Sequence, residues 1–495
     1  MRERELKFMP GPLFAVPDLT DLAPGTRADE PDTIRLHAAY FDTDDLRLAR
    51  SGASLRYRDD EGWMVKLPVA ADDALIRQEL RVDGDAADPP EAALDLVHAL
   101  IRREPVQFIA RLNTVRQRTV VRSAGGEQLA ELVDDEVSVL DGARLTARFR
   151  ELEVELAENV PEDLVRELKH RLHAAGSGHT DLVPKIVRAL GPRASDPPDV
   201  APPPRLDFAS TPLEVLRSAV ASSTARLVAH DPGVRIGTDP EDVHQARVAT
   251  RRLRSDLRSF RDVVDPEWSA ASSDELKWIG GLLGAVRDTD VLLERLEGRL
   301  EQLSKPELDA GKQLLAGLRD HREQARDELL AAMRADRYLQ LLDRLVDATH
   351  VIPPEDEALC DDIELTDVVR KPWRKLRDAA EAVNPDSPDP VLHAVRIRAK
   401  RCRYAAEAVA PALGKPARRF ASAIARVQEV LGEHQDAVVA EQWLRAHARG
   451  EGSNVERAFV AGELAALERV AAAESRAQFP QTWKAARHKR LRDWL

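Results

Sequence analysis

A proline-rich stretch divides the chain into two parts that cannot share one regular element. It runs from 191 to 205 with the sequence GPRASDPPDVAPPPR, and prolines at this density favour an extended spacer. At 495 residues the chain is also too long for a single hydrophobic core. We therefore expect two domains, at 1–190 and 206–495, joined by a linker at 191–205, and an α+β fold class for the whole chain.

The part before the linker has the pattern of antiparallel β-structure. Short segments alternate between apolar and polar residues, and many are separated by turn dipeptides such as Ser-Gly, Glu-Gly and Asp-Gly. With helices near 91–102 and 162–174, the pattern predicts an antiparallel barrel or strongly curved sheet with covering helices. The expected strands are 2–8, 35–42, 53–58, 63–68, 76–82, 113–122, 128–140 and 144–156.

The part after the linker is helical in pattern and repeats itself. Apolar residues recur at spacings of three and four, which predicts a helical bundle. A segment that begins at His244 returns at His393, displaced by 149 positions, and a Leu-Gly pair at 283 returns at 431, displaced by 148. Two matches in register indicate a duplicated multi-helix unit, with halves at about 206–350 and 360–495.

Composition narrows the class of protein. Hydrophobic residues make up 43% of the chain and charged residues 32%, as in folded proteins. The two cysteines, Cys360 and Cys402, lack the spacing of a zinc site and do not form a disulfide framework. The N-terminus is charged from its second residue, and no apolar stretch could span a bilayer. We expect a cytoplasmic protein that does not bind membranes.

Charged residues follow a strand period in the first part. Glu3, Glu5 and Lys7 share one face of a strand, and Glu151, Glu153 and Glu155 share one face of another whose opposite face is apolar. Each such face could simply meet solvent, as in a one-sided antiparallel sheet. Solvated faces usually mix polar residue types, however, whereas these are almost purely carboxylate or guanidinium. The same spacing recurs in Arg56/Arg58, Glu79/Arg81, Arg116/Arg118 and Asp134/Glu136.

A barrel with these faces inward would enclose a charged tunnel. Carboxylates on one wall would bind hard divalent cations through oxygen, and cations on the other walls would bind phosphate oxygens. Burial of so many charges would be prohibitive without a metal and a polyanion to complement them. We therefore expect acids and bases on separate inner walls.

The first part resembles the CYTH family, or triphosphate tunnel metalloenzymes. Its Glu3-x-Glu5-x-Lys7 opening matches the family's ExExK motif, and further blocks follow in order over residues 1–190. These blocks are Tyr40-Phe41-Asp42-Thr43, Leu55-Arg56-Tyr57-Arg58, Lys66-Leu67-Pro68 and Glu151-Leu152-Glu153-Val154-Glu155-Leu156.

The resemblance implies a metal-dependent triphosphatase with Mg²⁺ or Mn²⁺ as cofactor and inorganic triphosphate, or a related triphosphate, as substrate. The implied catalytic residues are Glu3, Glu5, Lys7, Glu153 and Glu155. The implied metal ligands are Glu3, Glu5, Asp134, Glu151, Glu153 and Glu155, with Asp135 as the alternative to Asp134. The implied triphosphate-binding residues are Lys7, Arg56, Arg58, Lys66, Arg116, Arg118 and Lys185, and Glu79 matches an acidic position in the middle of the barrel.

Basic residues follow a helix period in the second part. His244, Arg247, Arg251, Arg254 and Arg258 fall within an arc of roughly 80° on a helix. The repeat places His393, Arg396, Lys400 and Arg403 in the same arc. A solvated helix usually intersperses Glu among its cations, and this stripe has none. The stripe therefore predicts an anion-binding surface, although its histidines could be groove residues without a ligand.

These repeated blocks, each followed by a Leu-Gly pair, resemble the CHAD family over about 206–495. The resemblance implies two four-helix units related by pseudo-twofold symmetry, with a groove for long-chain polyphosphate. Gln435 replaces Arg287 and Val438 replaces Asp290 in the second half, so the halves need not bind equally. The implied polyphosphate-binding residues are His244, Arg247, Arg251, Arg252, Arg254, Arg258, Lys277, His393, Arg396, Lys400, Arg401, Arg403 and Tyr404.

Other functions compete with this reading. The chain could be a non-catalytic polyphosphate-binding protein of polyphosphate granules, although carboxylates near the ligand favour an enzyme. Within the CYTH family, a thiamine triphosphatase or class IV adenylyl cyclase is an alternative. The net charge of −13 opposes polyanion binding only as a global sum, since local clusters decide binding. Nucleic-acid binding is not expected, because the stripes lack interleaved aromatic residues for base stacking.

Overall fold

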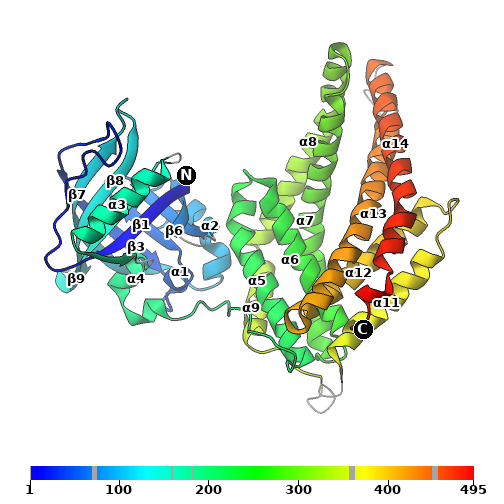
Figure 1. The fold of residues 1–495 in the computed structure, drawn as a ribbon, viewed down its shortest axis with the longest axis horizontal. Helices are drawn as coiled ribbons and strands as arrows, with labels where there is room; N and C mark the ends of the chain where they lie inside the picture. The colour runs from blue at the N-terminus through cyan, green and yellow to red at the C-terminus, as the bar shows by residue number, and fades with distance from the viewer. Residues whose placement is uncertain (1, 70–74, 158–159, 181–182, 356–362, 449–454) are drawn as a thin grey trace. The chain divides into compact units, whose positions relative to one another are not determined.

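The computed structural model describes residues 2–69, 75–157, 160–180, 183–355, 363–448 and 455–495. Within these ranges, the side chains of residues 2–5, 69, 75–77, 179–180 and 306 are not described. The chain divides into two compact units, Met1–Asp199 and Val200–Leu495, and the division falls inside the proline-rich stretch. The first unit contains the sheet and the second contains the long helices (Figure 1).

The N-terminal unit is built on one antiparallel sheet. The strand order is β10-β1-β6-β5-β4-β3-β7-β8-β9, with β2 beside β7, and β1 also pairs with β9. The strands are β1 (Arg2–Pro10), β2 (Arg27–Ala28), β3 (Asp32–Asp42), β4 (Ser54–Arg58), β5 (Gly62–Val69), β6 (Leu75–Val82), β7 (Gln107–Arg122), β8 (Gln128–Asp141), β9 (Arg144–Leu156) and β10 (Ser177–Thr180).

Every strand expected from the alternating pattern is present, and the antiparallel sheet is confirmed. The short strands β2 and β10 were not expected, because two to four residues are too few to show a period. The helices of this unit are α1 (Arg47–Arg50), α2 (Glu91–Ile101), α3 (Glu162–Ala174) and α4 (Lys185–Leu190), followed by the 3₁₀ turn η1 (Pro192–Ser195). Closure of the sheet into a barrel stays a prediction.

Helices cover the apolar faces of the strands, which leaves the charged faces turned the other way. Leu164 and Leu168 of α3 pack in one cluster with Leu152 and Val154 of β9 and with Phe8 of β1. A second cluster joins α2 to β4 and β5. Because side chains alternate along a strand, Glu153, which stands between Leu152 and Val154, lies on the face away from α3.

The second unit is helical, as its periodicity predicts. Three of its helices begin with a proline preceded by a residue whose side chain caps the helix: Thr211, Asp239 and Asp265. The helices are α5 (Pro212–Ile236), α6 (Pro240–Ser259), α7 (Pro266–Leu300), α8 (Lys305–Arg334), α9 (Asp336–His350), α11 (Leu365–Glu381), α12 (Asp389–Leu413), α13 (Lys415–His447), α14 (Val455–Ala486) and the 3₁₀ turn η2 (Lys489–Leu491).

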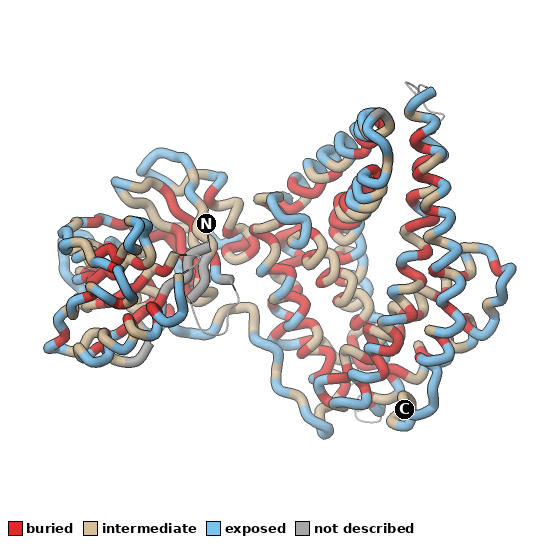
Figure 2. Tube along the Cα trace, turned by 45° about the horizontal axis from the view of Figure 1, so that its top comes forward, coloured by how far each residue is buried: buried red, intermediate tan, exposed pale blue. Residues whose placement is uncertain are grey.

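The buried residues of these helices lie on the sides that face one another (Figure 2). Leu296 of α7, Leu315 of α8, Leu444 of α13 and Leu464 of α14 belong to one cluster, which joins helices from both halves of the repeat. The arrangement as two pseudo-symmetric four-helix units stays a prediction. Among the described residues, no helix combines the length and the apolar character needed to cross a membrane.

Candidate functional site

The pairing of β1 with β9 brings the first and last charged motifs of the sheet together. Lys7 lies opposite Glu153 in the register, and the backbone of Glu5 lies opposite that of Glu155. Directly opposed residues share a face, so Lys7 and Glu153 project to the same side. The side chains of Glu3 and Glu5 lie outside the described residues, and the expectations for them remain predictions.

Lys7 is held in a buried carboxylate pair. Its Nζ lies 3.2 Å from Oε1 of Glu151 and also donates a hydrogen bond to Glu153. The exposed fractions are 2% for Lys7, 1% for Glu151 and 6% for Glu153. These values exclude a solvated face for the two glutamates, because side chains that meet water would be largely accessible.

Two further cations enter the same cluster from different elements. Nζ of Lys185, the first residue of α4, lies 2.5 Å from Oδ2 of Asp135 and 3.6 Å from both Glu151 and Glu153. Arg116 of β7 donates two hydrogen bonds to Asp135, at 2.9 and 2.8 Å, in a bidentate pair. The charged cluster is therefore Lys7, Arg116, Asp135, Glu151, Glu153 and Lys185.

The structure corrects the expectation that acids and bases occupy separate walls. In the charged cluster, Lys7 and Lys185 lie among the carboxylates and contact them directly. Buried carboxylates repel one another, and cations between them reduce that repulsion. Glu155 lies beside the cluster, where its charge acts on Arg116.

The two glutamates of the cluster differ in acidity. Burial raises the pKa of Glu151 to about 7, and the neighbouring Glu153 adds to this shift. Burial would also raise the pKa of Glu153, but Lys185 and Lys7 outweigh it and hold that pKa well below its usual range. One carboxyl of the pair is thus poised to exchange a proton near neutral pH while the other stays ionised.

Asp134 is not in the charged cluster, which corrects the expectation that it belongs to the metal-binding wall. Its carboxylate accepts hydrogen bonds from Arg150 at 2.7 and 2.5 Å on the other face of β8. Asp135 takes the inner position instead. Two consecutive aspartates must face opposite sides of a strand. The apolar residues before them, Leu132 and Val133, also lie one on each side, so the sequence gave no sign of which aspartate faces inward.

The remaining expected phosphate-binding residues lie on β4, β5 and β7. Glu61 contacts Arg56 at 3.0 Å and Arg58 at 3.3 Å. Lys66 pairs with Glu79 across β5 and β6. Arg118 pairs with Asp32 at 2.8 Å and is more exposed than Arg116.

Tyr40 is a residue of this site to which no role was given in advance. It lies opposite Arg56 in the register of β3 and β4 and is 5% exposed. Burial would raise the pKa of Tyr40, but the charges of Arg56, Lys185 and Lys66 lower it. Tyr40 therefore lies within electrostatic reach of both the charged cluster and the cations of β4 and β5. Its place in the Tyr40-Phe41-Asp42-Thr43 block was the signal that could have identified it.

The donor chemistry of the cluster suits a hard divalent cation. Its carboxylates supply oxygen ligands, and Oε2 of Glu151 is buried and accepts no described hydrogen bond, although Nε of Arg188 lies 3.4 Å from it. Among the described residues, which omit the side chains of Glu3 and Glu5, no group of three or more His, Cys, Asp or Glu side chains is arranged to hold a metal. The fit therefore rests on the oxygen donors of the cluster.

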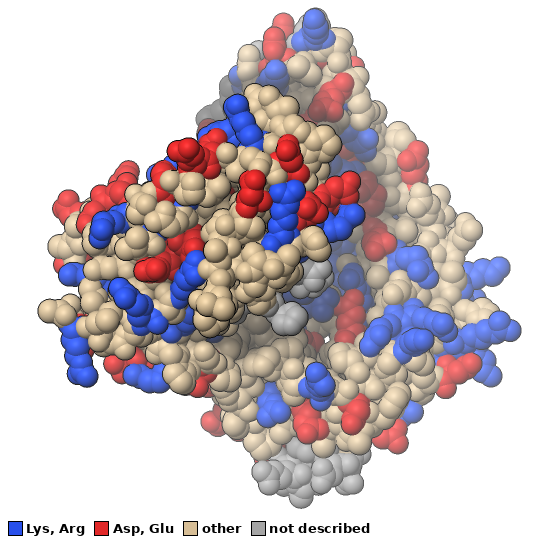
Figure 3. Space-filling model, turned by 60° about the vertical axis from the view of Figure 1, so that its left-hand side comes forward, with Lys and Arg blue, Asp and Glu red and all other residues tan. Residues whose placement is uncertain are grey.

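In the helical unit, the basic stripes of α6 and α12 lie close together, and we call the surface formed by Arg247, Arg251, Arg396 and Lys400 the basic groove. Burial, followed by the charges of Arg396, Arg251 and Arg247, lowers the pKa of Lys400 to about 7. These effects require the cations of the two helices to lie close together. Figure 3 shows that Lys and Arg alternate with Asp and Glu over much of the visible surface, so such a concentration of one sign is a local feature.

The repeated Leu-Gly pair contributes to this groove. A Cβ added at Gly284 of α7 would lie 3.5 Å from the guanidinium of Arg247. A Cβ added at Gly432 of α13 would lie 3.7 Å from the guanidinium of Arg396. Asp288 accepts hydrogen bonds from Arg247 at 2.5 and 3.1 Å, and Asp436 lies 3.9 Å from Arg396. Each half thus packs its stripe arginine beside a glycine and an aspartate of the next helix.

Arg252, Arg403 and Tyr404 serve the contact between α6 and α12. Arg252 and Arg403 each donate a hydrogen bond to Glu407, at 2.7 and 2.6 Å. The guanidinium groups of Arg251 and Arg252 both lie 5.5 Å from the ring of Tyr404. Glu407 was missed in the sequence, because it lies one turn beyond the recognised motif.

The other expected polyphosphate-binding residues are more scattered. Burial and Arg287 lower the pKa of His244, and Nδ1 of His393 is buried without a hydrogen-bond partner in the described structure. Lys277 is exposed on α7, and no described contact joins it to the groove. Arg254, Arg258 and Arg401 continue the basic surface toward the C-terminal end of α6.

The two replacements that distinguish the second half from the first have different effects on the structure. Arg287 acts electrostatically on His244, so its replacement by Gln435 removes a charge from the groove. Asp290 instead receives a hydrogen bond from Arg322 of α8 at 2.6 Å. Its replacement by the buried Val438 therefore exchanges an ion pair for apolar packing.

Comparison with known proteins agrees with the two-part organisation. A family model of the CYTH domain matches residues 1–185, and a model of the CHAD domain matches residues 218–445. Two relatives from strains of Mycobacterium tuberculosis, both named as uncharacterized proteins, are 32% identical to the chain over 474 residues. The matched region covers 90% of the chain and 89% of each relative.

Two solved structures are similar to part of the chain. The structure titled PptA from Streptomyces chartreusis is 23% identical, with a TM-score of 0.48, and the match covers 56% of this chain and 100% of that one. The CHAD domain from the plant Ricinus communis is 26% identical, with a TM-score of 0.47, and the match covers 58% and 97%.

Proposed function

Because the chain belongs to the proteins that join a CYTH domain to a CHAD domain, we propose that it hydrolyses inorganic triphosphate or a related triphosphate with a divalent metal, and that its helical unit binds polyphosphate. The CYTH family includes triphosphatases and related enzymes and is generally metal-dependent. The observation that carries the proposal is the buried charged cluster in which Lys7, Arg116 and Lys185 contact three carboxylates.

The proposal includes a closed tunnel. β1 pairs with β6 along one edge and with β9 along the other, so the pairings run from β1 through all the long strands and return to it. A sheet paired in this way would enclose the charged cluster together with Arg56, Arg58 and Lys66. Enclosure lowers the local dielectric and strengthens the interaction of each cation with a phosphate.

The cations of the tunnel would position the triphosphate. Arg56 and Arg116 have the planar geometry for bidentate binding of phosphate oxygens, and Lys185 adds a point charge. Binding would require Arg116 and Lys185 to exchange part of their contact with Asp135 for contact with substrate. The same charges would stabilise the transferring phosphoryl group.

The carboxylates would serve the metal and the attacking water. Glu3, Glu5, Glu153 and Glu155 would hold Mg²⁺ or Mn²⁺, with Glu151 or Asp135 as further ligands. A metal bound there neutralises phosphate charge and lowers the pKa of a coordinated water. Glu151 is our candidate for accepting a proton, because its carboxyl is the one poised near neutrality.

Phosphate release tests the proposal directly. We would assay the full chain with inorganic triphosphate, long-chain polyphosphate, ATP and thiamine triphosphate, each with Mg²⁺ and with Mn²⁺. Inorganic triphosphate should be cleaved fastest, and chelation of the metal should stop the reaction. Absence of turnover on every substrate, combined with retained polyphosphate binding, would favour a non-catalytic polyphosphate-binding protein instead.

Paired substitutions locate the site. Glu153→Gln should lower kcat by about two orders of magnitude, the loss typical of removing one electrostatic stabiliser. Glu136→Gln is the matched control, because Glu136 is exposed on β8 and lies outside the charged cluster. Unchanged turnover in a folded Glu153→Gln variant would refute the assigned site.

A further inference from the structure

A pocket of about 730 Å³ lies in the helical unit, where the C-terminal end of α6 meets α11 and α12. Cationic side chains from all three helices line it: Arg258, Lys371, Arg374, Lys375, Arg398 and Arg401. The cations of α11 belong to neither repeated motif.

Among the described residues, the positive charge of this pocket is largely uncompensated. Its three carboxylates are already paired with neighbouring arginines: Asp262 with Arg261, Asp367 with Arg370 and Asp378 with Arg377, at 3.1, 2.7 and 2.8 Å. Arg258, Lys371, Arg374, Lys375 and Arg401 form no ion pair with any other described residue. Like charges gathered without counter-charges repel one another unless an anion lies among them.

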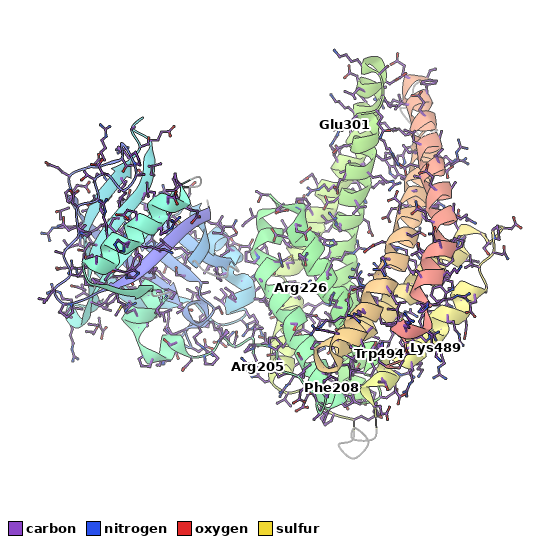
Figure 4. The ribbon with its side chains drawn as sticks, viewed as in Figure 1. Arg205, Phe208, Arg226, Glu301, Lys489 and Trp494 are labelled. Atoms are coloured by element: carbon purple, nitrogen blue, oxygen red, sulfur yellow. The ribbon has the colours of Figure 1, made fainter. Side chains whose placement is uncertain are left out.

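The fold holds the cations of α11 toward the pocket. Trp373 is 5% exposed on the opposite side of the helix, where its ring centroid lies 5.5 Å from that of Phe420 and 5.6 Å from that of Trp483. Trp494 at the end of the chain, labelled in Figure 4, lies 5.8 Å from Phe420 and completes this aromatic cluster. Because the apolar side of α11 packs in this cluster, its basic side faces the pocket.

The pocket is continuous with the basic groove. Arg254 and Arg258 follow Arg251 at spacings of three and seven along α6, on the same side of the helix. The charge of Arg258 acts on both Arg254 and Arg401, so these side chains lie close together. A row of cations therefore leads from the groove to the pocket. None of Arg251, Arg254 and Arg258 forms an ion pair with a described carboxylate, although the charge of Asp274 acts on Arg254.

We propose that this pocket is a second phosphate-binding site, in which Lys371, Arg374 and Lys375 bind a segment of the same polyphosphate chain that occupies the groove. The proposal rests on polyphosphate binding by the helical unit and extends it to a helix outside the repeated motifs. The lining favours bare phosphates over nucleotides, because its one aromatic residue among those described, Phe260, is 2% exposed and cannot stack on a base.

Acetylation of the full-length native chain tests the site without substitutions. Lysines would be modified in the presence and absence of long-chain polyphosphate and quantified by mass spectrometry. Polyphosphate should protect Lys371 and Lys375 by about fivefold or more, whereas Lys305 and Lys312, which are exposed on α8, should be modified equally in both samples. Equal modification of Lys371 and Lys375 with and without polyphosphate would overturn the proposal.

A charge-matched pair of triple variants gives the second measurement. Lys371→Ala/Arg374→Ala/Lys375→Ala should weaken the binding of long-chain polyphosphate by about tenfold and reduce its salt dependence. The control Lys305→Ala/Lys312→Ala/Arg319→Ala removes the same charge from α8 and should leave affinity within about twofold of the native value. Equal affinities of the two triple variants would contradict the pocket assignment.

Chain length and a groove variant separate this inference from the proposed function. Inorganic triphosphate is too short to occupy groove and pocket together, so only long-chain polyphosphate should lose affinity in both Lys400→Ala and the α11 variant. If the native chain binds no polyphosphate, the proposed function itself fails. If Lys400→Ala weakens long-chain binding while the α11 variant does not, only the second site is refuted.

Discussion

Nζ of Lys7 on β1 lies 3.2 Å from Oε1 of Glu151 on β9, although the two residues are 144 positions apart in the chain. The contact joins the opening motif of the sheet to its last long strand. It also places a cation inside a group of carboxylates that would otherwise repel one another. The proposed catalytic site therefore depends on a pairing that no local feature of either strand specifies.

Lys7→Met should destabilise the N-terminal unit strongly. The substitution leaves Glu151 and Glu153 buried without one of their main partners, and loss of one member of a buried ion pair costs about 3–5 kcal/mol. Urea unfolding should show this loss. Arg166→Met is the control, because Arg166 forms an exposed pair with Asp163 that is worth less than about 1 kcal/mol. Equal effects of the two substitutions would contradict the buried network.

Arg251→Glu should separate the two proposed activities. Reversal of one charge in the basic groove should lower the affinity for long-chain polyphosphate by about tenfold or more and flatten its salt dependence. Triphosphate hydrolysis should remain within about twofold of the native rate, because Arg251 belongs to the helical unit. Arg319→Glu on α8 is the matched reversal, and a parallel loss of both activities in Arg251→Glu would argue against this division.

Polyphosphate binding should weaken as the pH rises above about 7. Burial and the neighbouring arginines lower the pKa of Lys400 to about 7, so the free groove loses this charge as the pH rises through that value. A bound polyanion favours the charged form and raises the pKa, which means that binding takes up a proton. Titrations from pH 6.5 to 9 should reveal the slope, and Lys400→Arg should remove it because arginine stays charged.

Asp256 should make the helical unit less stable at alkaline pH. Burial raises the pKa of Asp256 to about 8, so the folded state binds more protons than the unfolded state between the ordinary value of 3.8 and about 8. Stability from this group is therefore present at low pH and is lost as the pH rises through that window. In urea unfolding, the free energy of unfolding of Asp256→Asn should rise relative to that of the native chain by on the order of 1–3 kcal/mol between pH 5.5 and 8.5.

The control for this prediction is Asp262→Asn, which alters an exposed carboxylate paired with Arg261. Its stability relative to the native chain should not change with pH over the same range. A difference between native chain and Asp256→Asn that stays constant from pH 5.5 to 8.5 would show that Asp256 does not titrate there.

Local periodicity was enough to predict the long strands and the helical character of the second part. The alternation of Glu151, Glu153 and Glu155 with apolar residues specified a strand with one polar face, and the spacing of the stripes specified helices. Such patterns are local, since a strand repeats every two residues and a helix every 3.6. The repeat at 149 positions likewise required only comparison of the chain with itself.

The tertiary structure decided which charges meet. Alternation required Asp134 and Asp135 to face opposite sides, but only the packing of β8 beside Arg150 and Lys185 selected Asp135 for the cluster. Lys371, Arg374 and Lys375 belong to neither repeated motif, and they form a site only because α11 packs beside α6 and α12. Periodicity records the side of an element on which a residue lies, whereas contacts across distant elements depend on how the cores pack.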